Sequence, residues 1–266
     1  MELVDIQFSF NRALQRAFCM KRLLIASIAI LTSGFFFIVS NALGGSSLLP
    51  FFLSAALFMP TAMLITRLYC DALKNRQTTI SDCIAGSWES LIASSYLFLP
   101  LLLTYSALWL VLHIFILLTT IPLIGQLLAS FLAFAPLLVH LALLLLALCS
   151  IAMLFILPPL ITLKGIHYIQ AIRIALARVR QDPFSHLLLA ILSLAPITAV
   201  AAIASAASAL TYKGAIIDAA YAPLYALVAM LPIVAFFAPA LLFFFQFSAE
   251  AYLLLNKWHK RRDVEE

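Results

Sequence analysis

The sequence predicts an all-α polytopic integral membrane protein, and composition is the first observation that predicts it. Of the 266 residues, 65% are hydrophobic and only 10% are charged, and the mean hydropathy is +1.12. A soluble globular chain carries about a quarter of its residues charged, because its surface must be hydrated. The composition therefore excludes soluble enzymes, nucleic-acid binders, disulfide scaffolds and disordered tails, and we expect no nucleic-acid partner.

The spacing of the charges is the second observation, and it predicts six transmembrane helices. A charged side chain at the bilayer centre costs roughly 2.5 to 3.5 kcal/mol, so long uncharged stretches mark the spans. A helical span needs about 20 residues. The first uncharged stretch holds two spans joined by a tight turn, and the last two stretches hold one span each. These four expected spans are Leu23 to Leu43, Leu48 to Tyr69, His186 to Leu210 and Pro223 to Phe247.

The long uncharged stretch between Glu89 and Lys164 holds the third and fourth spans. As one helix, Leu127 to Leu163 would measure about 55 Å, against a hydrocarbon core of about 30 Å. We therefore expect the fourth span at about Leu137 to Leu163. For residues 122–137 a re-entrant piece, an interfacial piece and part of a long tilted helix all remain open.

The basic residues predict the orientation, because short cytoplasmic loops carry an excess of Lys and Arg. With six spans, every Lys and Arg except Lys213 falls on one side, which is 15 of the 16. The sequence thus predicts a bacterial inner-membrane protein with both termini in the cytoplasm. Residues 1–22 form a cytoplasmic amphipathic segment, 23–255 a single membrane domain and 256–266 a charged cytoplasmic tail.

Basic amphipathic helices are predicted before three hairpins of spans. The clearest runs from Ile166 to Val179, with apolar residues spaced three or four apart, and weaker copies lie around Phe10 to Ala17 and Asp82 to Leu91. Prolines near mid-span also recur, with a polar residue eleven positions later in each case: Pro60 and Asp71, Pro159 and Gln170, Pro239 and Glu250. These matched offsets indicate a threefold repeat, although chance matches arise easily in an apolar chain.

Arginines on the third amphipathic helix are candidate contacts for anionic lipid headgroups: Arg173, Arg178 and Arg180. A helix lying in the membrane plane places its basic side chains at the headgroup level, where each contributes about 1 kcal/mol. The alternative interpretation is that these arginines only set the topology and snorkel.

Three stretches of the chain follow a pattern found in a known family: Leu157-Pro158-Pro159-Leu160-Ile161, the basic run Ala171 to Arg180, and Phe184 with the span after it. Through these stretches the chain resembles the six-span membrane domain of some bacterial glycerophosphodiester phosphodiesterases and its stand-alone inner-membrane relatives. The resemblance implies six spans. The hydrolase barrel of that family is absent here, so no catalytic residue is carried over.

Polar residues inside spans are the default place to search for function, because they are costly to keep there. The candidates are His113, His140, Gln246 and Glu250. The histidines suit a proton shuttle or a metal ligand, or simply a hydrogen bond to a neighbouring helix. Gln246 and Glu250 suit a cytoplasmic mouth, or a carboxylate that faces headgroup water or pairs with a basic neighbour. No motif of a catalytic, cofactor-binding or metal site occurs, and no two cysteines have ligand spacing.

The faces of the spans yield two further expectations. Leu and Phe dominate the third, fourth and sixth spans, which suits exposure to lipid. The fifth span is rich in small residues, which favours a tightly packed internal or oligomeric face. Its small residues are Ala195, Ala199, Ala201, Ala202, Ser205, Ala206 and Ala209.

Three functional hypotheses follow from these features. The first is a non-enzymatic scaffold or assistant of other envelope components, which binds anionic lipid and a membrane-protein partner or a second copy. The second is a transporter or channel for a small or lipidic solute, built on the proline-containing hairpins. The third, an intramembrane lipid-modifying enzyme, requires His113 or His140 to meet another polar group in a cleft.

Overall fold

The computed structural model describes residues 3–42, 48–76, 79–85, 88–121, 134–164, 168–211 and 222–265. Every regular element in these ranges is a helix, as the sequence predicts. The helices are α1 (Leu3–Arg16), α2 (Met20–Ala42), α3 (Leu48–Leu73), α4 (Ile80–Ala85), α5 (Trp88–Thr119), α7 (Ala135–Lys164), α8 (Tyr168–Gln181), α9 (Pro183–Thr211) and α10 (Ala222–Glu265).

Five of the described helices are long and apolar enough to cross a membrane. Their membrane-length segments are Met20–Val39, Leu99–Leu118, Leu137–Leu163, Pro183–Ala207 and Val228–Trp258. The remaining long helix, α3, has 26 residues and contacts α2, α5, α7 and α10. The helices therefore indicate a multi-pass integral membrane protein.

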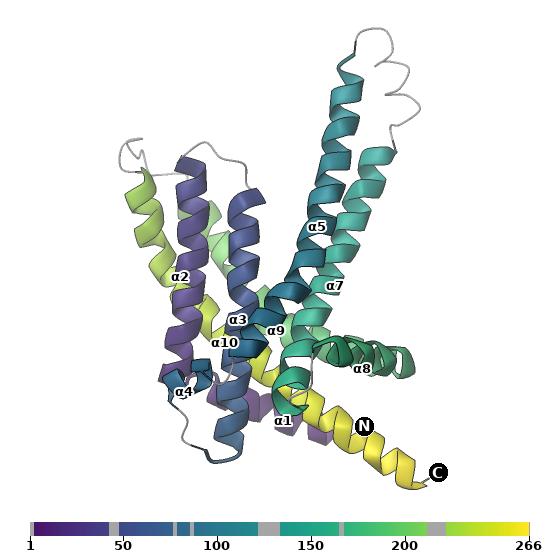
Figure 1. The fold of residues 1–266 in the computed structure, drawn as a ribbon. Coiled ribbons are helices and arrows are strands. Elements are labelled where there is room, and N and C mark those ends of the chain that lie inside the picture. Colours follow the sequence, from purple (N-terminus) through teal and green to yellow (C-terminus); the bar gives the residue numbers. More distant parts are fainter. Residues whose placement is uncertain are drawn as a thin grey trace.

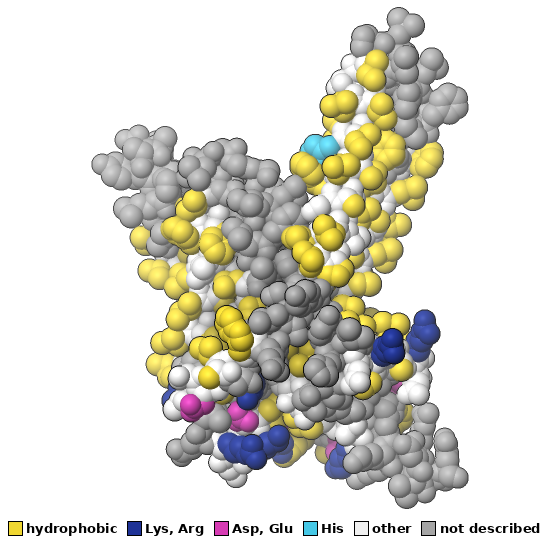
Figure 2. Space-filling view, viewed as in Figure 1, with side chains coloured by type: hydrophobic (Ala, Val, Ile, Leu, Met, Phe, Trp, Pro, Cys, Tyr) yellow, Lys and Arg dark blue, Asp and Glu magenta, His cyan; other side chains and the backbone are white. Residues whose placement is uncertain are grey.

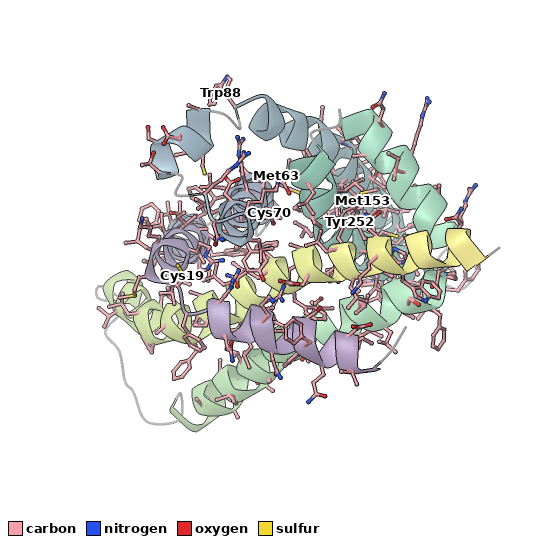
Figure 3. All side chains as sticks on the ribbon, turned by 90° about the horizontal axis from the view of Figure 1, so that it is seen from below. Cys19, Met63, Cys70, Trp88, Met153 and Tyr252 are labelled. Carbon is pink, nitrogen blue, oxygen red and sulfur yellow. The ribbon has the colours of Figure 1, made fainter. Side chains whose placement is uncertain are left out.

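The two ends of the molecule differ in charge. The long helices run between them, and α1, α4 and α8 lie at the lower end together with both termini (Figure 1). On the face drawn in Figure 2, Lys, Arg, Asp and Glu side chains gather at this lower end, while most of the described side chains in the upper part are hydrophobic. We call the lower end the charged end. Seen from below, α1 and the C-terminal part of α10 run side by side across it (Figure 3).

Helix α10 is the centre of the packing, because it contacts α1, α2, α3, α7 and α9. Its phenylalanines Phe243, Phe245 and Phe247 are at most 1% exposed and join the largest buried cluster. Phe10 of α1 packs edge-on against Phe243, with ring centroids 4.8 Å apart. The expectation that the sixth span faces lipid is therefore wrong for its second half. Composition could not distinguish a helix face buried in the protein from one exposed to lipid, because the core and the lipid are equally apolar.

The small-residue face of α9 also differs from expectation. Ala195, Ala199, Ala201, Ala202, Ser205 and Ala206 are exposed, whereas His186, Leu189 and Ser193 of that helix are buried. The internal alternative is thus wrong for these six residues within one chain. An oligomeric face stays a prediction, and the side chain of Ala209 lies outside the described residues.

Helix boundaries differ from expectation in two places. The sixth span was expected to end at Phe247, yet α10 continues to Glu265 through most of the charged tail. The weak amphipathic copy at Asp82 to Leu91 does not form one described helix, since α4 ends at Ala85 and α5 begins at Trp88. The fourth span agrees well, because α7 covers Ala135–Lys164, and residues 122–133 lie outside the described ranges.

The three pairs of a proline and a polar residue eleven positions later are not placed alike in the structure. Asp71 and Glu250 share one helix with Pro60 and Pro239 respectively. Gln170, in contrast, lies on α8, whereas Pro159 lies on α7. The second unit thus departs from the other two, and the threefold repeat stays a prediction.

Candidate functional site

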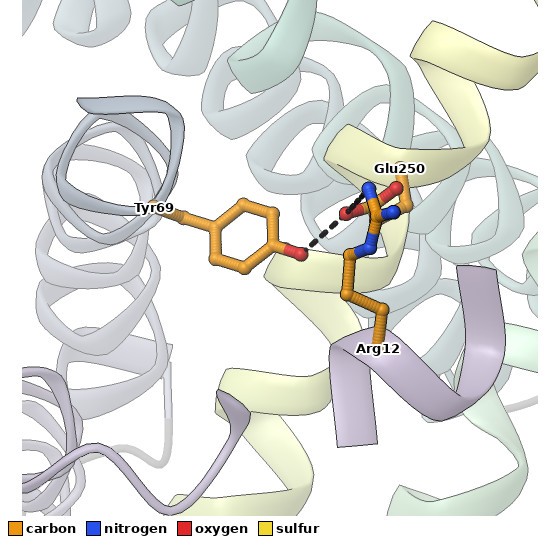
Figure 4. A network of polar contacts seen from close by, with 3 residues as sticks. All are labelled: Arg12, Tyr69 and Glu250. Atoms are coloured by element: carbon orange, nitrogen blue, oxygen red, sulfur yellow. Dashed lines mark hydrogen bonds and ion pairs between the residues drawn. The ribbon is translucent and has the colours of Figure 1, made fainter. Parts of the chain in front are cut away.

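A buried polar cluster lies at the charged end, where α1, α3 and α10 meet (Figure 4). The hydroxyl of Tyr69 donates a hydrogen bond to Oε1 of Glu250 over 2.6 Å. Tyr69 is 0% exposed and Glu250 is 4% exposed. A hydrogen bond to a buried carboxylate is strong, because no water competes for it.

Arg12 completes the cluster from α1. Its Nη1 lies 3.6 Å from Oε1 of Glu250, and its Cζ lies 4.6 Å from the centre of the Phe8 ring. The Arg12 side chain is 39% exposed, so it remains partly hydrated while it balances the charge of Glu250. Removing one partner of such a pair is costly, because the other charge is left buried and unpaired.

Two further arginines surround the ring of Tyr69. The Cζ atoms of Arg16 and Arg22 lie 5.9 and 5.3 Å from its centroid. Arg22 is 6% exposed, and its Nη1 has no hydrogen-bond partner in the described part of the chain. The negative face of the aromatic ring offsets part of the cost of burying that cation.

The backbone carbonyl of Arg16 ties α1 to α2 and α10. It accepts a hydrogen bond from Nη2 of Arg22 and another from Nε2 of Gln246, each over 3.3 Å. Carbonyls in the last turn of a helix lack partners within the helix, and donors from outside satisfy them. Gln246 and Glu250, one turn apart on α10, thus both serve to hold α1.

Cys19 lies between α1 and α2, beside Arg22. Partial burial acts to raise the pKa of its thiol, but the hydrogen bond and charge of Arg22 outweigh that effect and leave the pKa lowered. A lowered pKa increases the fraction of reactive thiolate at neutral pH.

A cleft of about 230 Å³ adjoins the cluster between α1 and α10. Asp5, Arg12, Glu250 and Lys257 contribute two negative and two positive charges to its wall, and Phe8 and Trp258 contribute aromatic rings. Arg12 and Tyr69 both engage the buried carboxylate of Glu250 at the wall of this cleft.

A second pocket, of about 440 Å³, lies between α3, α5, α7, α9 and α10. Its lining is almost entirely aliphatic and aromatic, and Tyr105 and Ser150 are its two residues with polar side chains. The hydroxyl of Ser150 donates to the carbonyl of Leu146 over 2.7 Å, within its own helix.

The predicted histidines line neither pocket and lie on exposed faces of α5 and α7. Nδ1 of His113 is 3.0 Å from the carbonyl oxygen of Trp109, and the two rings lie 3.5 Å apart between centroids. Trp109 belongs to the same helix as His113 and not to a neighbouring one, so both interpretations of His113 stay predictions. Among the described residues, no group of three His, Cys, Asp or Glu side chains is placed to hold a metal ion.

The predicted lipid-contacting arginines lie on α8. Arg173 and Arg180 are exposed, and Ala171 and Ala175 of the same helix are buried. The side chain of Arg178 lies outside the described residues. Helix α8 contacts α5, α7 and α9, so these arginines are separate from the polar cluster.

The sequence identified Gln246 and Glu250 and left open that Glu250 pairs with a basic neighbour, but it did not identify Arg12 as that neighbour or Tyr69 as a hydrogen-bond donor. The available signal was a lone carboxylate at the end of an apolar span. A tyrosine and several arginines lie at the ends of other predicted helices, on the same predicted side of the membrane.

Comparison of the chain with protein-family models, curated proteins and solved structures found no match.

Proposed function

We propose that this protein is a non-enzymatic scaffold or assistant of other components of a bacterial inner membrane. In this proposal α3 also crosses the membrane, which brings the number of spans to six, the charged end faces the cytoplasm and both termini are cytoplasmic. The excess of Lys and Arg at the predicted cytoplasmic segments supports this orientation.

The observation that carries the proposal is the state of Glu250. Glu250 is the one buried acid among the described residues, and its carboxylate is engaged by Tyr69 and Arg12. A transporter that is coupled to protons or ions uses a carboxylate that is free to exchange them. Here the carboxylate instead fastens α1 to α3 and α10, which is a structural use.

Helices α1 and α8 supply the surfaces for partners in this proposal. Each is a 14-residue helix at the charged end, with one buried side and exposed basic or apolar residues on the other. Arg173, Arg178 and Arg180 then meet anionic headgroups, and the exposed face of α9 meets a membrane-protein partner or a second copy.

The test is extraction of the tagged protein in native-lipid discs, followed by mass spectrometry of proteins and lipids. We expect a protein at a fixed ratio to the wild type, and we expect the double variant Arg173→Gln, Arg180→Gln to recover less anionic lipid than the wild type. Lys74→Gln is the matched control, because Lys74 is an exposed basic residue at the end of α3. Recovery of lipid alone, with no protein at fixed ratio, contradicts the proposal.

A second candidate function is transport of a lipidic solute, and the apolar pocket favours it over transport of a polar one. A polar solute needs hydrogen-bonding groups along its path. Reconstitution in vesicles that contain a fluorescent phospholipid decides between the candidates. A scaffold leaves the dye in the inner leaflet protected from dithionite, whereas a lipid transporter exposes it.

A further inference from the structure

The apolar pocket is built from five helices that meet near the middle of their lengths. Phe58 and Met59 come from α3, Leu101 from α5, Ile151 from α7 and Phe244 from α10. Phe244 precedes Glu250 by six residues, so the pocket lies about 9 Å along α10 from the polar cluster. The pocket therefore lies within the depth that the five membrane-length segments span.

Water does not suit this pocket. At about 30 Å³ for each molecule, its 440 Å³ would take about 15 waters. Each buried water needs two to four polar partners. Ser150 donates its hydroxyl within its own helix, and Tyr105 also has a partner already, so the wall leaves such a cluster without support.

An empty pocket of this size does not suit a packed interior either. Protein interiors leave few voids larger than one water molecule, because each void forfeits dispersion contacts along its whole wall. The volume lies within the range of about 300–1,000 Å³ that is typical of ligand sites. An apolar molecule of extended shape fits both the volume and the wall.

The surroundings supply such a molecule. The α5–α7 hairpin leans away from the other long helices (Figure 1), and the space-filling view is hollowed between the hairpin and the rest of the molecule (Figure 2). We call this hollow the notch. Leu103 and Leu110 of α5 and Leu141 and Leu145 of α7 are more than half exposed, so the hairpin is solvated by hydrocarbon in a bilayer.

We infer that the pocket binds one hydrocarbon chain of a bilayer lipid, which enters from the notch and leaves its headgroup outside. The wall selects for a chain without polar substituents, because every polar group in the pocket would lack a partner. This inference is independent of the scaffold function, since a scaffold and a transporter could both hold a chain.

Photo-crosslinking in lipid discs tests the inference with a phospholipid that carries a diazirine near the end of one acyl chain. After irradiation, peptide mass spectrometry locates the label. We expect label on segments 101–105 and 147–154, and little label there from a phospholipid with its diazirine on the headgroup. The variant Ala147→Phe places an aromatic ring in the pocket from α7, and we expect it to lower the label several-fold, because the ring narrows the space left for a chain.

Ala201→Phe is the matched control, since Ala201 is exposed on α9 and does not line the pocket. We expect it to label as the wild type does. If Ala147→Phe does not fold, Leu101→Trp narrows the same pocket from α5. Equal labelling of wild type and a folded filler variant would overturn the inference, and so would label spread evenly over all exposed positions of the hairpin.

Discussion

At the scale of single residues, the hydrogen bond from Tyr69 to Glu250 is the contact with the largest expected effect. Both side chains are buried, so loss of the hydroxyl leaves one carboxylate oxygen with Arg12 alone. We expect Tyr69→Phe to destabilise the protein by about 1–3 kcal/mol, measured as a lowered unfolding temperature in detergent micelles.

Thr198→Val is the control for that substitution. The hydroxyl of Thr198 is exposed and bonds only to Ala195 of its own helix. Its loss should change stability by less than about 0.5 kcal/mol. Equal effects of the two variants would show that the cluster contributes nothing beyond a surface hydroxyl.

Cys19 supplies a prediction about pH. Because Arg22 holds the pKa of its thiol below the ordinary value, alkylation of Cys19 by iodoacetamide should begin at a lower pH than alkylation of a free cysteine. Arg22→Gln removes the charge and should shift the rate profile to higher pH. The measurement is the alkylation rate between pH 6 and 10, followed by mass spectrometry of the Cys19 peptide, and an unmoved profile contradicts the assignment.

At the scale of elements, the junction between α1 and α10 depends on small side chains. Ala13 is 0% exposed and belongs to the buried cluster with Phe243 and Phe247, whereas Leu14, its neighbour on α1, is 41% exposed. This close approach of the two helices places the part of α10 that carries Glu250 against the side of α1 that holds Arg12.

Overpacking at this junction should separate α1 from α10. We expect Ala13→Phe to cost about 1–3 kcal/mol, because no space remains between the helices. Leu14→Phe enlarges a side chain on the exposed side of the same helix and should leave the stability of the protein nearly unchanged. Thermal unfolding of both variants checks this, and similar values for the two would place α1 away from α10.

At the scale of the whole molecule, the six-span proposal predicts a definite pattern of exposed segments. Alkaline phosphatase is active only outside the cytoplasm, so fusions at residues 45, 127 and 216 should be active. Fusions at residues 77, 166 and 266 should be inactive. A five-span protein in which α3 does not cross would reverse the activity of the fusions that follow it, starting at residue 77.

The extent of prediction from sequence differs between the elements and the site. The long helices follow from uncharged stretches, and α7 lies within two residues of its expected start at Leu137. The exposed arginines of α8 follow from a pattern of three and four residues. Neither needs a contact between distant segments.

The pairing of Arg12 with Glu250 and the burial of Phe243 to Phe247 could not be predicted in the same way. Each depends on which side of α10 meets α1, α2 and α3, and an apolar helix has no pattern that marks a side when lipid and core are alike. The exposure of the small residues of α9 has the same cause.

The sequence by itself determined that the chain is helical and membrane-embedded, because charges are excluded from hydrocarbon and backbone groups must be satisfied within each span. Only the tertiary structure decided that Glu250 is engaged by Tyr69 and Arg12, and that an apolar pocket opens beside α10. These features arise between helices that are far apart in the chain. Tertiary packing, and not local composition, determines which of these helices are in contact.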